Sequence, residues 1–119
     1  MGTKNYTDLI VWQKSMTLAT DVYRLTQKLP KDELYGLTSQ LRRAVVSIPS
    51  NIAEGNGRAS TREYARFLSI ARGSKSEVET QLLLCVNLGY LQQEEVEEAL
   101  NLCVEISKML NAMLAKFVN

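Results

Sequence analysis

Residues 60–88 read STREYARFLSIARGSKSEVETQLLLCVNL, and their apolar side chains recur at helical intervals over the whole stretch. A repeat of three or four residues predicts one long amphipathic helix. Ser60, followed by Glu63, forms a capping-box pattern, which predicts that the helix begins directly after Ser60. Gly89 can adopt the left-handed conformation that ends many helices. The side chains expected on the buried face are Tyr64, Phe67, Leu68, Ala71, Val78, Leu82, Cys85 and Leu88.

The preceding segment carries a second helical pattern that contains a proline. Asp32 follows Pro30 and is expected to cap this helix, which ends at the glycines of residues 55–57. Pro49 removes one backbone hydrogen bond inside the helix, so we expect a kink near residues 47–50. The neighbouring polar side chains are expected to satisfy the backbone carbonyl that the proline leaves free. The expected buried positions are Leu34, Leu37, Leu41, Val45, Ile48 and Ile52.

The first segment carries two rows of helical spacing. One row consists of Leu9, Trp12, Met16, Ala19, Tyr23 and Thr26, and the other of Val11, Ser15, Leu18, Val22, Leu25 and Leu29. A bundle helix needs only one wide apolar stripe, so the second row indicates contact with another subunit. We therefore expect an oligomer interface formed by Val11, Leu18, Val22 and Leu25. The alternative is a single broad stripe buried within one bundle.

A fourth helical pattern runs from about Gln93 to the end of the sequence. Four such segments with short connections predict an all-α fold, an up-down-up-down antiparallel four-helix bundle with its second helix kinked at Pro49. At 119 residues, the chain 1–119 accommodates a single domain, with a short flexible N-terminus over residues 1–6. Gly73, in the middle of the third helix, indicates either a close approach of a neighbouring helix or a slight bend.

The composition argues against an enzyme. The sequence contains no histidine, which is the commonest general base near neutral pH and a frequent zinc ligand. Cys85 and Cys103 occupy apolar helical positions and are expected to be reduced core thiols, so we expect no metal, no cofactor and no small-molecule substrate. No leader or membrane-spanning run is visible, and we expect a cytoplasmic protein that does not contact a membrane.

Three stretches identify a family resemblance. They are QLRRAVVSIPSNIAEG at residues 40–55, YARFLSIARGS at residues 64–74 and LGYL at residues 88–91, supported by DLIVWQK at residues 8–14. The sequence closely resembles the bacterial intervening-sequence proteins of the 23S rRNA, some of which are encoded inside insertions in that rRNA gene. The resemblance covers essentially the whole chain.

The resemblance implies architecture more than activity. It implies a bundle that assembles into a ring, a homopentamer, similar to the accessory protein of diversity-generating retroelements. That relative resembles a basic ring that binds nucleic acid and a reverse transcriptase. The intervening-sequence proteins themselves have no established biochemical activity.

Charge is unevenly distributed along the sequence. Residues 38–76 carry seven basic and two acidic side chains, whereas residues 77–119 carry two basic and seven acidic ones. Grouped guanidinium groups suit phosphate, which they bind bidentately. The candidate nucleic-acid-binding residues are Arg42, Arg43, Arg58, Arg62, Arg66, Arg72 and Lys75.

Two other interpretations remain open at this stage. The basic side chains can instead pair with the glutamates at residues 94, 95, 97 and 98 of the fourth helix, within or between subunits. The oligomer can also be a protein-interaction adaptor with no nucleic-acid role. The leading hypothesis is a non-enzymatic homo-oligomer that binds RNA or a ribonucleoprotein.

Overall fold

The computed structural model describes residues 5–117. The regular secondary structure in that range is helical. The α-helices are α1 (Ile10–Thr26), α2 (Leu37–Asn56), α3 (Thr61–Asn87) and α4 (Gln93–Lys116). Two short 3-10 helices, η1 (Tyr6–Asp8) and η2 (Lys31–Glu33), precede α1 and α2. No strand occurs among the described residues, so the predicted all-α fold with four helices is confirmed. The predicted flexible start falls mostly on residues 1–4, outside the described range.

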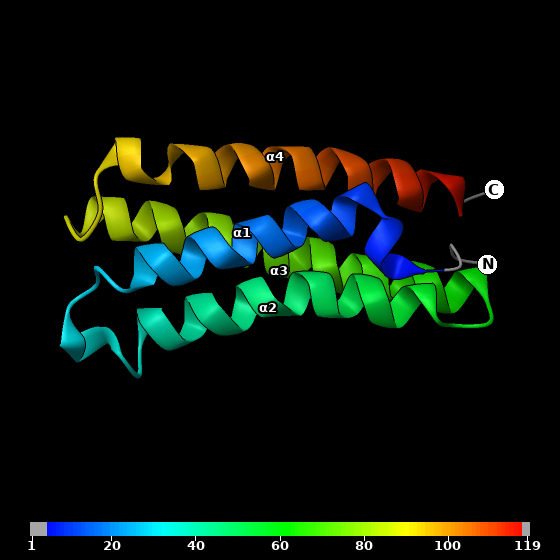
Figure 1. Ribbon diagram of the computed structural model, residues 1–119, viewed down its shortest axis with the longest axis horizontal. Helices are drawn as coiled ribbons and strands as arrows, with labels where there is room; N and C mark the ends of the chain where they lie inside the picture. Colours follow the sequence, from blue (N-terminus) through cyan, green and yellow to red (C-terminus); the bar gives the residue numbers. More distant parts are fainter. Residues whose placement is uncertain (1–4, 118–119) are drawn as a thin grey trace.

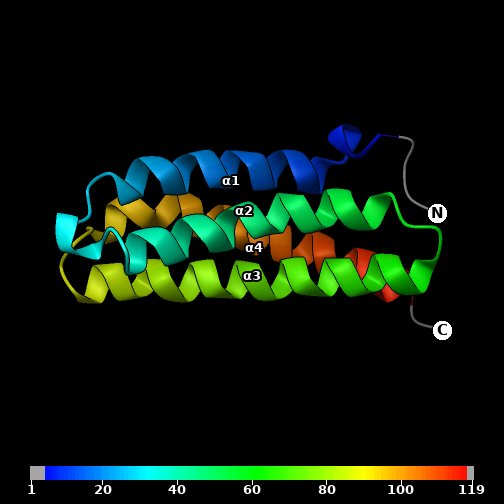
Figure 2. The ribbon, with the colours of Figure 1, turned by 90° about the horizontal axis from the view of Figure 1, so that it is seen from below.

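The four α-helices lie side by side in an elongated bundle with principal extents of 44 × 23 × 22 Å. Figure 1 and Figure 2 show each helix running opposite to the one before it, with the connections at alternate ends. Helix α1 packs against α2 and α4, and α3 packs against the same two helices. Every helix therefore has two neighbours and one face toward the common core.

The core takes one buried row of side chains from each helix. From α1 this row is Val11, Ser15, Leu18, Val22 and Leu25. The predicted oligomer interface is therefore wrong, because Val11, Leu18, Val22 and Leu25 are 3%, 0%, 0% and 8% exposed within a single chain. The other row is the partly exposed one, with Met16 43% and Tyr23 40% exposed. Ser15 fits the core because its hydroxyl donates to the Val11 carbonyl at 2.7 Å.

The start of α2 differs from the sequence prediction. Asp32 lies in η2 and does not cap α2, which begins at Leu37. The backbone N–H of Leu37 donates instead to Glu33 Oε1 at 3.1 Å, so Glu33 satisfies a helix-start donor. Leu34 precedes the helix and is 50% exposed, rather than buried as predicted.

Pro49 lies inside α2, which continues without a break from Leu37 to Asn56. Beside it, the side-chain amide of Asn51 donates to the Ser47 carbonyl at 2.8 Å and to the Ser47 hydroxyl at 2.9 Å. The Ser74 hydroxyl of α3 donates to Ser47 at 2.9 Å. These polar groups satisfy one another around the proline, as a structural role requires. The kink itself stays a prediction.

Glycines occupy two different environments in α2 and α3. A Cβ atom at Gly55 would lie 2.8 Å from Phe67 Cβ and 3.0 Å from Tyr64 Cδ1, so α2 and α3 approach each other closely there. A Cβ atom at Gly73 would meet nothing within 4 Å, which removes close approach as the explanation for that glycine. Gly89 has φ 79°, the left-handed conformation expected after α3.

We expect Gly55→Ala to lower the free energy of unfolding by about 1 to 3 kcal/mol, because the added methyl group overpacks the α2–α3 contact. Gly73→Ala is the matched control and should raise the free energy of unfolding by up to about 1 kcal/mol, since alanine favours helices and the site is open. Urea denaturation followed by circular dichroism measures the free energy of unfolding of both variants. A stabilised Gly55→Ala variant would contradict the close approach.

The buried row of α1 makes a second prediction. We expect Leu18→Glu combined with Val22→Glu to abolish the helical circular dichroism signal at 25 °C, because two carboxylates would be buried in the core at a cost of several kcal/mol. Met16→Glu, on the exposed row, should leave the signal unchanged. A double variant that stays folded as a monomer would contradict the burial of Leu18 and Val22 in the core and support their place in a subunit interface.

Candidate nucleic-acid interface

The seven predicted basic residues do not share one surface. Arg42 points toward α1, where its Nε donates to Thr26 Oγ1 at 2.9 Å and its guanidinium lies 4.6 Å from the centre of the Tyr23 ring. Arg43, the next residue, points toward the opposite side of α2 and donates to Ser39 Oγ at 3.3 Å. Consecutive residues of a helix point about 100° apart, which separates these two side chains.

Arg58 and Arg66 come together around an aromatic ring. Their guanidinium carbons lie 4.8 and 4.7 Å from the centre of Phe67, in positions favourable for cation–π interaction. Arg58 pairs with Glu54 at 2.6 Å, and Arg66 lies 3.7 Å from Glu63. Phe67, predicted from the helical pattern to lie in the core, is half-buried beneath these guanidinium groups.

The remaining three basic residues have other surroundings, and only Arg58 and Arg66 lie over the Phe67 ring among the described residues. Arg62 is exposed and has no ion pair within the described part of the chain. Arg72 extends toward α4 and donates to Asn111 Oδ1 at 2.9 Å. Lys75 is only 7% exposed and pairs with Glu79 at 2.9 Å. A buried, paired ammonium is poorly placed to reach a phosphate, so Lys75 serves the bundle.

Two glutamates of α4 pair with lysines outside the candidate set. Lys28 of the α1–α2 connection pairs with Glu95 at 2.6 Å, and this contact is the main cause of the lowered pKa of Glu95. Lys14 of α1 pairs with Glu105 at 2.6 Å. Over residues 5–117, none of the seven basic candidates forms an ion pair with residues 94, 95, 97 or 98. The pairing that the sequence left open is therefore not made within the subunit.

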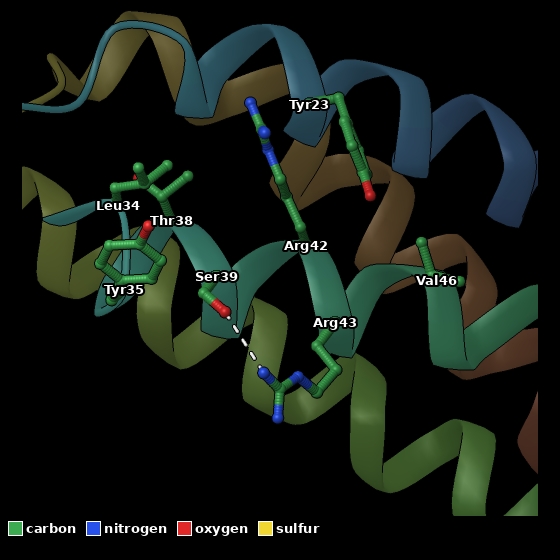
Figure 3. A pocket seen from close by; sticks show the side chains of 8 residues that line it. All are labelled: Tyr23, Leu34, Tyr35, Thr38, Ser39, Arg42, Arg43 and Val46. Carbon is green, nitrogen blue, oxygen red and sulfur yellow. Dashed lines mark hydrogen bonds between the residues drawn. The ribbon is translucent and has the colours of Figure 1, made fainter. Parts of the chain in front are cut away.

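A hollow of about 500 Å³ lies between the end of α1 and the start of α2, shown in Figure 3. Tyr23 and Arg42 form one wall, and Leu34 and Tyr35 form the other. Tyr35 is 93% exposed, the most exposed of the large apolar side chains described. Aromatic rings beside guanidinium groups suit stacked bases and phosphates. Neither tyrosine was predicted as a site residue, although Tyr35 next to Gly36 after a proline signals an exposed turn.

The two thiols support no metal or nucleophilic chemistry. Cys103 is fully buried, and burial, together with Glu79, raises its pKa to about 12. Burial also raises the pKa of Cys85. Across residues 5–117 there is no group of three or more Cys, Asp or Glu side chains able to hold a metal ion. None of the helices described there is long and apolar enough to cross a bilayer.

Comparison with known proteins decides the family. Residues 7–112 match the family described as 23S rRNA-intervening sequence protein. The chain belongs to this family. A solved structure of a protein of unknown function from the S23 ribosomal protein family of Bacteroides thetaiotaomicron is similar, with 27% sequence identity and a TM-score of 0.82. The similarity covers 88% of this chain and 98% of that one. No curated protein matches this member of the intervening-sequence family.

Proposed function

We propose that this intervening-sequence protein is a non-enzymatic homo-oligomer that binds RNA or a ribonucleoprotein through its arginines. The observation that carries the proposal is the ion-pair pattern. Four of the seven basic candidates have no carboxylate within pairing distance among the described residues, namely Arg42, Arg43, Arg62 and Arg72. We propose the cytoplasm as the place of this activity.

Phosphate is the ligand that best matches these arginines. A guanidinium offers five N–H donors, and Arg42, Arg43 and Arg72 each use one of them in a hydrogen bond to an uncharged oxygen. Phosphate oxygens can accept from the other donors, and each contact releases condensed counterions from the RNA. In a ring of subunits, the same surfaces would repeat and multiply the weak contacts of one copy.

The second candidate is a protein-interaction adaptor with no nucleic-acid role. The pairing of Arg58 with Glu54 favours it, because a neutralised guanidinium attracts phosphate less. The nearby carboxylate of Glu63 weakens the attraction of Arg66 for phosphate in the same way. The two candidate functions differ in how affinity depends on salt concentration. Only for a phosphate-binding surface does the slope of log affinity against log salt depend on the number of phosphates contacted.

We expect about micromolar, largely sequence-independent RNA binding at about 50 mM salt. Combining Arg58→Ala, Arg62→Ala and Arg66→Ala should weaken binding and flatten the slope of log affinity against log salt, by about 0.7 for each lost contact with single-stranded RNA. Arg24→Ala is the matched control, because Arg24 is an exposed arginine on α1, outside the candidate set. Fluorescence anisotropy of a labelled oligonucleotide measures both affinity and slope.

The competing function gives the opposite pattern. If these arginines serve the fold or assembly, the triple variant loses thermal stability or changes oligomer mass, and the wild type retains no RNA even at about 50 mM salt. Measuring the thermal midpoint, the oligomer mass and RNA binding on the same preparation separates the two functions.

We expect static light scattering at micromolar concentration to give a mass near five times 13.4 kDa, as the family resemblance implies. The buried α1 row cannot supply the contact, so the interface must use outward-facing apolar side chains. Those more than 40% exposed include Ile10, Met16, Leu83, Leu84, Leu88 and Val104. A mass of 13.4 kDa at every concentration would refute the assembly.

A further inference from the structure

Two hollows of different chemistry meet on the first half of α2. The first, described above, opens toward α1. The second, of about 610 Å³, lies between α2 and α3. Tyr35, Ser39 and Arg43 line both, so these three residues form the ridge over which one hollow continues into the other.

The first hollow is cationic. Its lining contains Arg42 and Arg43 and no carboxylate. The Nε of Arg42 donates to Thr26 and its planar group lies over Tyr23, so this guanidinium is held in one orientation. Arg43 has a single hydrogen bond, of 3.3 Å, and lies exposed on the ridge. Phosphate groups fit this side because both cations lack a charged partner within the described chain.

The second hollow is polar and carries the groups that recognise base edges. Gln40, Glu77 and Gln81 line it, and carboxylate and amide side chains hydrogen-bond to the amino and ring nitrogens of bases. The Gln81 amide donates to Gln40 Oε1 at 3.4 Å, and Gln81 Oε1 is buried without a hydrogen-bond partner among the described residues. A buried acceptor of this kind is costly, and a donor from a ligand would satisfy it once the Gln81 side chain turns toward the hollow. The carboxylate of Glu77 also disfavours phosphate on this side.

Tyr35 connects the two environments. Its side chain is 93% exposed and projects from the turn between η2 and α2 at the junction of the hollows, as Figure 3 shows for the first of them. An aromatic ring in this position forms a platform for a base that has left its stack. Bases in a duplex are already stacked and paired, so such a platform selects single strands.

We propose that the first half of α2 binds single-stranded RNA. One base stacks on Tyr35 with its edge toward Gln81 and Glu77, and the adjoining phosphates lie against Arg43 on the ridge and Arg42 in the first hollow. The proposal rests on the proposed function, since it names the form of RNA and the place where it binds. It places the base contact at the opposite end of α2 from the Arg58, Phe67 and Arg66 cluster, whose arginines are left to contact phosphate.

The test measures the anisotropy of a labelled single-stranded oligonucleotide, and of the same strand annealed to its complement, with the full-length protein. We expect Tyr35→Ala to weaken single-strand binding about tenfold with an unchanged salt slope, because it removes stacking and no charge. Tyr35→Phe, the matched control, should bind like the wild type. Arg43→Gln should reduce the salt slope by about 0.7. Duplex binding should not respond to Tyr35→Ala.

The outcomes separate this site from the function it rests on. If the wild type binds no RNA, both proposals fail. If Tyr35→Ala binds like the wild type while the Arg58, Arg62 and Arg66 triple variant loses binding, the function stands and this site is wrong. If Tyr35→Ala instead changes the oligomer mass by light scattering, the ridge is a contact between copies and the proposal is overturned. Because Tyr35 is almost fully exposed, its substitution removes no core packing.

Discussion

Burial of one row of side chains from each helix sets the rotation of that helix about its axis. In α1 the row through Leu18 and Val22 is fully enclosed, and in α2 the same holds for Leu41, Val45 and Ile48. Once those rows face inward, the direction of every other side chain follows from the helical repeat of 3.6 residues. This is why Arg42 reaches α1 whereas Arg43 does not. The position of each hollow depends on the same rotation.

Local signals in the sequence predicted where α3 begins and ends. Which face of a helix is buried depends on the neighbouring helices, and the sequence predicted this less well. The Ser60 hydroxyl accepts from the Glu63 N–H at 3.1 Å, and Gly89 ends α3, as their positions in the sequence indicated. The two apolar rows of α1 were assigned the wrong way round, because both rows follow helical spacing and spacing alone does not tell which row the neighbouring helices cover.

The candidate site was predictable residue by residue but not as an arrangement. Each arginine was identifiable from charge clustering, yet charge along the sequence does not report which helix face carries it. Phe67 matched the apolar pattern of α3. The close approach of α2 and α3 at Gly55 places Phe67 at the margin of the core. There the guanidinium groups of Arg58 and Arg66 reach its ring. Tyr35 fell inside the predicted second helix, one residue after Leu34, whereas α2 begins at Leu37, so the helical repeat gave no sign that Tyr35 lies in an exposed turn.

The order in which the helices pack has a consequence for how the chain reaches this structure. Contacts between α1 and α2, α2 and α3, and α3 and α4 all join segments adjacent in the sequence, and among the four α-helices described only the α1–α4 contact joins distant parts of the chain. Bundles dominated by such local contacts fold within microseconds to milliseconds. Since α4 is the last of the four helices to be synthesised, its contact with α1 is the last that the growing chain can make, and the pairs Lys14–Glu105 and Lys28–Glu95 form only then.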